Sequence, residues 1–361
     1  MEQLTHVMEM LNLMMQPAFC VRQGMILGVN PEAQQYMLSQ GMAVSDILAT
    51  GKDEYAAFSS GCLYLTVNVC QRSWGASVTR LDDLDIFVLE QDQDQAQLRS
   101  LALAAQELRE PLSSVMTVAD RFFPALDVAD APELQNQVAR INRGLFHLLR
   151  LVSNMSDASR YVQETAGRME TRDISSFLSE LFAHCKELLQ QVEVNLEYSG
   201  LPESLYCLID PEKLERSIHN LLSNAVKFTP QGGTIQASAV VRGQKLYLQI
   251  QDNGCGIPDT LRNSIFRRYL RSPGVEDGRH GIGLGMVLVR STASIHGGTV
   301  LVEQPESGGT RVTLTLQIRQ DRSGTVRSNI LKVDYAGERD HSLIEFSDTL
   351  PHSMYRKDSV N

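Results

Sequence analysis

The chain has 361 residues, 43% of them hydrophobic, and a formal net charge of -10. The length predicts two or three domains, and the composition is that of a folded protein, which excludes wholesale disorder. The acidic balance disfavours a general role on nucleic acids or anionic membrane surfaces.

The cysteines and the N-terminus indicate where the protein works. The six cysteines lie far apart without zinc-binding spacing, which is typical of reduced thiols in a cytosol. No apolar run approaches the ~20 residues that a transmembrane helix needs. Glu2 and Glu9 stand where a signal peptide would carry basic residues. We therefore expect a cytoplasmic protein with no membrane span and no nucleic-acid partner.

Residues 1–90 have the element order of a small α/β module. A helical stretch precedes Asn30 and Pro31, a pair typical of a capped helix start, and strand-like runs follow at 62–70 and 86–90. This order resembles a PAS sensor domain, which implies a five-stranded sheet that cups a ligand or a partner. A dimerisation or spacer module of similar fold is the alternative.

Residues 91–165 predict two long helices, separated by a break between Pro124 and Pro132. Apolar residues recur at spacings of three and four along both helices, so each carries one apolar seam. Two such helices bury little surface alone, and we expect a hairpin that dimerises into a four-helix bundle. The alternative is a hairpin that packs only on its own chain.

The stretch 172–318 alternates strand-like and helical segments, as in an α+β domain. Helices are expected at 212–227 and 284–296, and each carries part of a motif. We expect the tail at 319–361 to be loosely ordered, although its piece Ser342-Leu-Ile-Glu-Phe could dock elsewhere.

The first motif lies on the helix at 212–227. Asn220, Asn224 and Lys227 are four and three residues apart, so they share one helix face. Two amide oxygens and an ammonium on one face suit a magnesium-bound polyphosphate. A polar solvent-exposed face is the alternative.

The second motif begins where Asp252 ends a strand. A carboxylate there can accept a hydrogen bond from an exocyclic amine, while Gly254 and Gly256 let the backbone approach a flat ring. This pattern suits an adenine, although an ordinary Asp-Asn-Gly turn would look the same.

The third motif is Ile265-Phe266-Arg-Arg-Tyr269, and glycines supply the fourth and fifth motifs. Gly281, Gly283 and Gly285 open the helix at 284–296, where backbone amides would form an anion cradle. Gly308-Gly-Thr310 precedes the last strand. Arg271 lies in the segment between the motifs, where a lid over the phosphates would be.

In this order, the motifs resemble the N, G1, F, G2 and G3 boxes of bacterial sensor histidine kinases, and residues 98–165 resemble the dimerisation and phosphotransfer hairpin of that family. The resemblance covers well over half the chain. It implies a GHKL-type α/β-sandwich domain that binds ATP and Mg²⁺, and a homodimer that works with a response regulator or a partner histidine kinase. It also implies that Asn224 holds magnesium, that Asn220 and Lys227 contact phosphates, and that Asp252 reads adenine, with Thr310 among the other ATP-binding residues.

Asn220 argues against two other branches of this superfamily. Hydrolytic ATPases and serine kinases of the superfamily carry a glutamate as general base four residues before the magnesium asparagine. Here Asn220 occupies that place, and an amide cannot take a proton at neutral pH.

The hairpin departs from the family at its chemical positions. Where the family presents His-Glu-Leu-Arg-Thr/Asn-Pro-Leu, this chain reads Gln106-Glu-Leu-Arg-Glu110-Pro-Leu. The amide nitrogen of Gln106 has a delocalised lone pair and will not attack a phosphate, so Glu107 has no imidazole to activate. Glu110 would repel an incoming aspartyl phosphate.

The sequence therefore predicts a pseudokinase that binds Mg-ATP without autophosphorylation at Gln106. Two alternatives stay open. The chain could be an active histidine kinase that acts on the hairpin of a partner or on its own His147. It could also be a non-enzymatic scaffold that regulates a kinase or a response regulator.

Overall fold

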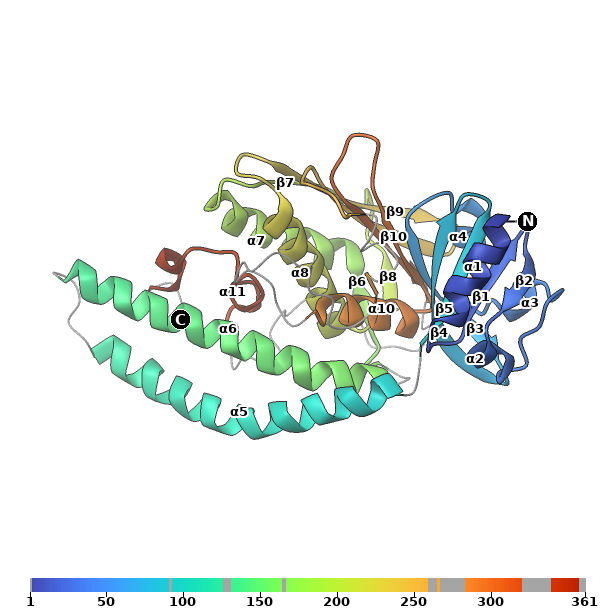
Figure 1. The fold of residues 1–361 in the computed structure, drawn as a ribbon. Helices are drawn as coiled ribbons and strands as arrows, with labels where there is room; N and C mark the ends of the chain where they lie inside the picture. Colours follow the sequence, from blue (N-terminus) through green and yellow to red (C-terminus); the bar gives the residue numbers. More distant parts are fainter. Residues whose placement is uncertain are drawn as a thin grey trace.

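The structure, a computed structural model, is that of an α+β multidomain protein (Figure 1). It comprises an N-terminal α/β region, a long helical hairpin and a C-terminal α/β domain. It describes residues 2–90, 93–125, 131–163, 167–258, 265–266, 283–319 and 339–356.

The N-terminal region is a five-stranded antiparallel sheet in the order β2-β1-β5-β4-β3. Asn30 caps a helix as predicted, because its side chain accepts from the backbone of Ala33 at 2.9 Å. The same side chain also accepts from Ala18 and donates to Gln16, so it fixes the approach to the first strand. The elements are α1 (Glu2–Asn12), β1 (Ala18–Arg22), β2 (Met25–Val29), α2 (Pro31–Gln34), α3 (Val44–Ile47), α4 (Lys52–Ala57), β3 (Cys62–Val69), β4 (Arg72–Leu81) and β5 (Leu84–Leu89).

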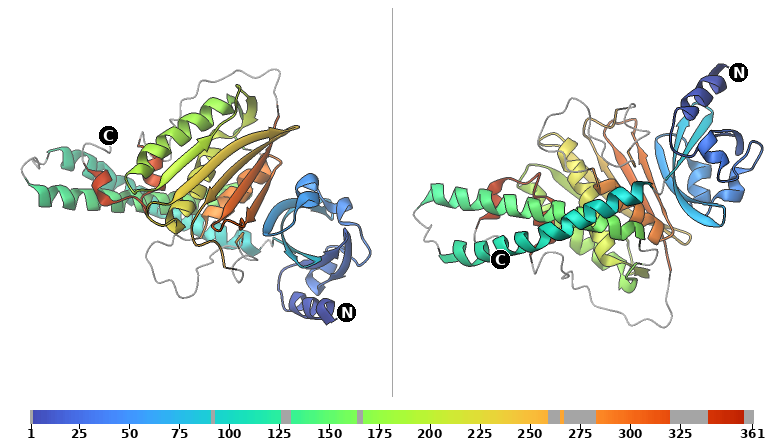
Figure 2. Two further views of the ribbon diagram at one scale, coloured as in Figure 1. Left: turned by 90° about the horizontal axis from the view of Figure 1, so that it is seen from above. Right: turned by 60° about the horizontal axis from the view of Figure 1, so that its bottom comes forward.

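The hairpin consists of α5 (Gln93–Ala125) and α6 (Pro132–Gln163), which lie side by side (Figures 1 and 2). This matches the two predicted seamed helices. Ala105, Met116 and Ala119 are buried along α5. Several other seam residues are at least half exposed in the single chain, namely Leu108, Val115, Phe122, Ile141 and Leu148.

The C-terminal domain is a mixed sheet covered by helices on one face (Figure 2). The sheet order is β11-β12-β10-β9-β7, with β7 parallel to β9 and the other pairs antiparallel. A separate ladder joins β6 to β8. The elements are β6 (Glu170–Asp173), α7 (Ile174–Gln190), β7 (Asn195–Ser199), β8 (Tyr206–Ile209), α8 (Pro211–Phe228), β9 (Thr234–Arg242), β10 (Lys245–Asp252), α10 (Gly285–Ile295), β11 (Thr299–Glu303) and β12 (Arg311–Gln317).

The two sheets are joined edge to edge into one ten-stranded sheet, because β3 pairs antiparallel with β11. Side chains reinforce this junction. Lys245 on β10 contacts Glu54 at 2.8 Å and Asp53 at 2.9 Å, and the hydroxyl of Tyr247 donates to Glu54 at 2.9 Å. The N-terminal region is therefore fastened directly to the domain that carries the motifs.

Residues 339–356 are folded, which corrects the expectation of a loosely ordered tail for this stretch. The residues form α11 (His341–Glu345) and a 3₁₀ turn, η1 (His352–Tyr355), and pack against α6 and α8. The physical reason is an apolar set that a five-residue helix and its flanking turns bury together: Leu343, Ile344, Phe346, Leu350 and Tyr355, each at most 4% exposed.

No helix in the described ranges has the length and apolar character needed to cross a membrane.

Candidate nucleotide site

Helix α8 carries the first motif, and its start follows directly from the sequence. Asp210 caps the helix by accepting from Lys213, and Pro211 occupies the first helical position. The helix then buries one face against the sheet, with Leu214, Ile218 and Leu222 fully buried. The motif residues follow on its last turns.

Asn220 lies at the contact between α8 and α10. Its amide donates to the carbonyl of Arg216 at 2.8 Å, and the side chain is buried. A methyl group at Gly285 would lie only 2.8 Å from Oδ1 of Asn220, so the start of α10 approaches α8 closely. The first and fourth motifs therefore meet at Asn220 and Gly285.

Asn224 and Lys227 lie further along α8. The amide of Asn224 is half-buried and forms no side-chain hydrogen bond within the described part of the chain, so it is available to a ligand. Lys227 differs, because its Nζ lies 2.5 Å from the carboxylate of Asp348 in the tail. Burial lowers the pKa of Lys227, and Arg150 lowers it further, whereas Asp348 opposes this shift.

Asp252 lies at the end of β10 and is buried. Its Oδ1 accepts from the backbone of Gly254 at 2.9 Å and of Thr310 at 3.1 Å. Burial raises the pKa of Asp252, and these hydrogen bonds limit the rise. A carboxylate offers about four acceptor positions, so capacity remains for the amine of a ligand.

The glycines bring the second and fifth motifs together beside the end of α8. A methyl group at Gly254 would collide with the carbonyl of Phe228, and one at Gly256 would lie 3.2 Å from the carbonyl of Gly309. The loops that carry Asp252, Gly256 and Thr310 are therefore adjacent. Gly283, with φ of +75°, precedes α10.

Part of the predicted site lies outside the described residues. Gly281 and Arg271 belong to that part. Phe266 is described; it is 2% exposed and packs against Tyr64 of the N-terminal region, with ring centroids 5.5 Å apart. Within the described ranges, no group of three or more His, Cys, Asp or Glu could hold a metal ion.

The hairpin presents Gln106 and Glu107 on the exposed surface of α5. Close by, Leu101 of α5 and Met155 of α6 pack against the start of α10. His147 on α6 is half-buried, and burial lowers its pKa. The structure thus places the hairpin against the helix that follows the glycine motif.

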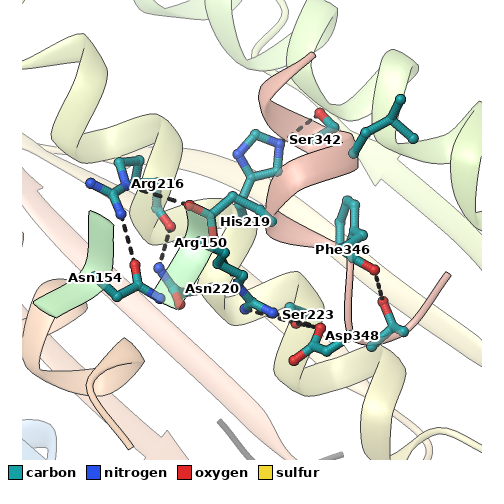
Figure 3. A network of polar contacts seen from close by, with 12 residues as sticks. Arg150, Asn154, Arg216, His219, Asn220, Ser223, Ser342, Phe346 and Asp348 are labelled. Carbon is teal, nitrogen blue, oxygen red and sulfur yellow. Dashed lines mark hydrogen bonds and ion pairs between the residues drawn. The ribbon is translucent and has the colours of Figure 1, made fainter. Parts of the chain in front are cut away.

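The sequence analysis missed a buried ionic cluster between α6, α8 and the tail (Figure 3). Arg150 on α6 contacts Asp348 at 2.6 Å and Glu345 at 3.0 Å, and Arg216 on α8 reaches Glu345 at 3.4 Å. Burial alone would raise the pKa of Asp348, but Arg150 and Lys227 hold it below its ordinary value. No local sequence pattern predicts the pairing of Arg150 with Glu345, which lies 195 positions away.

Comparison with known proteins gives matches to one family model and to several histidine kinases. Residues 209–320 match the family described as histidine kinase-, DNA gyrase B-, and HSP90-like ATPase. The chain is 33% identical over 238 residues to the hybrid signal transduction histidine kinase D of Dictyostelium discoideum, covering 62% of this chain and 15% of that protein. It is 30% identical over 242 residues to the sensor histidine kinase TmoS of Ectopseudomonas mendocina, covering 66% of this chain and 25% of that protein.

A solved structure also matches. The crystal structure of full-length ShkA in complex with AMPPNP covers 62% of this chain and 46% of that chain, with a TM-score of 0.50 and 23% identity, so the two share a fold. The chain spans a quarter or less of the two curated relatives. By these matches, the chain is similar to sensor histidine kinases over about two thirds of its length, and its residues 209–320 match the family described as histidine kinase-, DNA gyrase B-, and HSP90-like ATPase.

Proposed function

We propose that this chain binds Mg-ATP in its C-terminal domain and signals through a dimeric helical hairpin, without autophosphorylating at the usual hairpin position. The observations that carry the proposal are the close approach of Gly285 to Asn220, the adjacent loops that carry Asp252 and Thr310, and Gln106 on the exposed surface of α5. The AMPPNP in the crystal structure of ShkA supports ATP as the nucleotide.

Each part of the nucleotide would meet one motif. Asp252 would accept a hydrogen bond from the adenine amine, and its carboxylate is held in place for this by Gly254 and Thr310. Asn220 and Lys227 would contact the phosphates, together with the amides at Gly281, Gly283 and Gly285. Arg271 would close over them.

The side chain of Asn224 fits the place of a magnesium ligand. Magnesium prefers hard oxygen ligands and keeps several waters, so one protein amide and the nucleotide phosphates can hold it. The amide of Asn224 is half-buried and without a side-chain partner in the described ranges, which suits that place. Bound there, the ion would neutralise phosphate charge and orient the chain of phosphates.

The hairpin would transmit the state of the pocket. Its seam residues remain half exposed in one chain, and a second copy would cover them, which supports a homodimer. The N-terminal region would act as a PAS-like sensor. With no acceptor at Gln106 and with Glu110 at the position that faces a receiver, output would come from binding a response regulator or a partner histidine kinase.

Calorimetric titration with Mg-ATP tests the proposed binding. The wild-type chain should bind Mg-ATP, and Asn224→Ala should weaken binding in the presence of magnesium but not in its absence. Absence of binding by the wild-type chain would favour the non-enzymatic scaffold that binds no nucleotide.

A further inference from the structure

The C-terminal segment 339–356 packs against both the hairpin and the C-terminal domain. Tyr355 packs edge-on against Phe146 of α6, with ring centroids 5.4 Å apart. Ser342 of α11 and His219 of α8 form a hydrogen bond of 2.8 Å between Oγ and Nε2. The segment therefore contacts α6 and α8 at the same time, as Figure 1 shows for α11.

Buried charges fix this segment in one position. Arg150, Glu345 and Asp348 are each at most 6% exposed in their side chains, and Arg150 contacts both carboxylates. Arg216 contacts Glu345 from the α8 side. Removing one partner from a buried charged group is strongly unfavourable. If the segment left, Arg150 would lose both of its carboxylates, whereas Arg216 would lose Glu345 and keep Asp157 of α6. The contact of the segment with Arg150 is therefore more than incidental surface packing.

One of these carboxylates, that of Asp348, pairs with Lys227, the residue of the first motif that we propose contacts the phosphates. Asp348 lies 2.5 Å from Nζ of Lys227, whose side chain is only 10% exposed. The Asp348 carboxylate offers oxygen acceptors to the ammonium just as a phosphate would, so it takes up donors that a phosphate would otherwise use. Two anions in one place also repel each other.

We propose that segment 339–356 is an internal regulator of the nucleotide site: Asp348 competes with nucleotide phosphates for Lys227, and the same segment locks α6 to α8. This inference rests on the proposed function, because it takes Lys227 to be a phosphate contact. Phosphates that take Lys227 from Asp348 would weaken the lock. The state of the pocket would thereby reach the hairpin through the tail.

Hydrogen exchange in the full-length wild-type chain tests the lock without any substitution. The backbone amides of 342–350 should be protected without nucleotide, and Mg-ATP should raise their exchange several-fold, whereas adenosine, which has no phosphate, should leave them unchanged. Protection that Mg-ATP leaves unchanged or increases would overturn the inference.

Calorimetry on variants tests the competition. Asp348→Asn should lower the Kd for Mg-ATP about tenfold, the scale of one charge-assisted contact. Asp83→Asn is the matched control, because Asp83 pairs with Arg22 on the exposed surface of the N-terminal region. Leu350→Ser, which removes an apolar anchor of the segment and leaves Asp348 in the sequence, should also lower the Kd.

The outcomes separate the two proposals. Wild-type binding that Asp348→Asn leaves unchanged would overturn the inference and leave the proposed function standing. Absence of binding by the wild type and by every variant would remove both. If Asp348→Asn does not fold, the exchange of the wild-type segment and the Kd of Leu350→Ser give the decision.

Discussion

Asp252 is the residue at which adenine recognition is tested most simply. Asp252→Asn keeps the size of the side chain, but one of its two polar atoms becomes a donor that faces the ligand amine. The Kd for Mg-ATP should rise about tenfold or more, the scale of a hydrogen bond to a charged group. Calorimetry measures it, and Asp83→Asn, far from the pocket, serves as the control. An unchanged Kd would remove Asp252 from the adenine site.

The same carboxylate predicts how binding depends on pH. Burial raises the pKa of Asp252, so the group takes up a proton at a higher pH than an ordinary aspartate does. The protonated form is a poorer acceptor for the adenine amine. Mg-ATP affinity should therefore fall on acidification, beginning above the usual aspartate range, and this extra loss should be missing in Asp252→Asn. A titration series from neutral pH downward checks it; identical profiles for the two chains would contradict it.

At the scale of elements, the contact between α8 and α10 depends on a missing side chain. In Gly285→Ala, the new methyl group would press against Oδ1 of Asn220, so the two helices would have to move apart. We expect a loss of about 1–3 kcal/mol in the free energy of unfolding, together with weaker Mg-ATP binding. Urea denaturation measures the first and calorimetry the second.

Gly144→Ala is the matched control for that substitution. Gly144 lies within α6, and a methyl group there meets no atom within 4 Å. Alanine is favoured over glycine inside helices, so this variant should gain about 0.5–1 kcal/mol. Equal changes in the free energy of unfolding for the two substitutions would show that the close approach of α10 to Asn220 does not affect stability.

The exposed seam of the hairpin predicts dimerisation. Val115→Glu would put a charge on an α5 residue that is 53% exposed in the single chain and would be covered by a second copy. Light scattering after size exclusion should show a dimer for the wild type and a monomer for the variant. Leu81→Glu, at an exposed residue of β4, should stay dimeric. A wild-type chain that is monomeric at micromolar concentration would contradict the four-helix bundle.

For the whole molecule, the sequence predicts elements better than it predicts how distant elements meet. The apolar periodicity of α5 and α6 and the cap at Asn30 are local, so both were predictable. The edge pairing of β3 with β11 consists of backbone hydrogen bonds, which carry no side-chain pattern. The sequence indicated that the piece at 342–346 could dock, but not where, because Glu345 finds its partner Arg150 195 positions away.

The same difference between local features and long-range contacts applies to the candidate site. Asn220, Asn224 and Asp252 could be placed from their motifs, since spacing on a helix and position at a strand end fix where side chains point. The engagement of Lys227 by Asp348 could not, because it depends on the fold of the tail. The roles of Arg271 and Gly281 stay predictions, because these residues lie outside the described ranges.

Incorporation of phosphate from γ-labelled ATP into the purified chain tests the central claim that ATP is held without transfer at Gln106. The wild-type chain should carry no acid-labile, base-stable label under conditions in which it binds Mg-ATP. Gln106→His should gain such label, and adding Asn224→Ala to that variant should abolish the gain. Acid-labile label on the wild-type chain, comparable to that on Gln106→His, would contradict the claim.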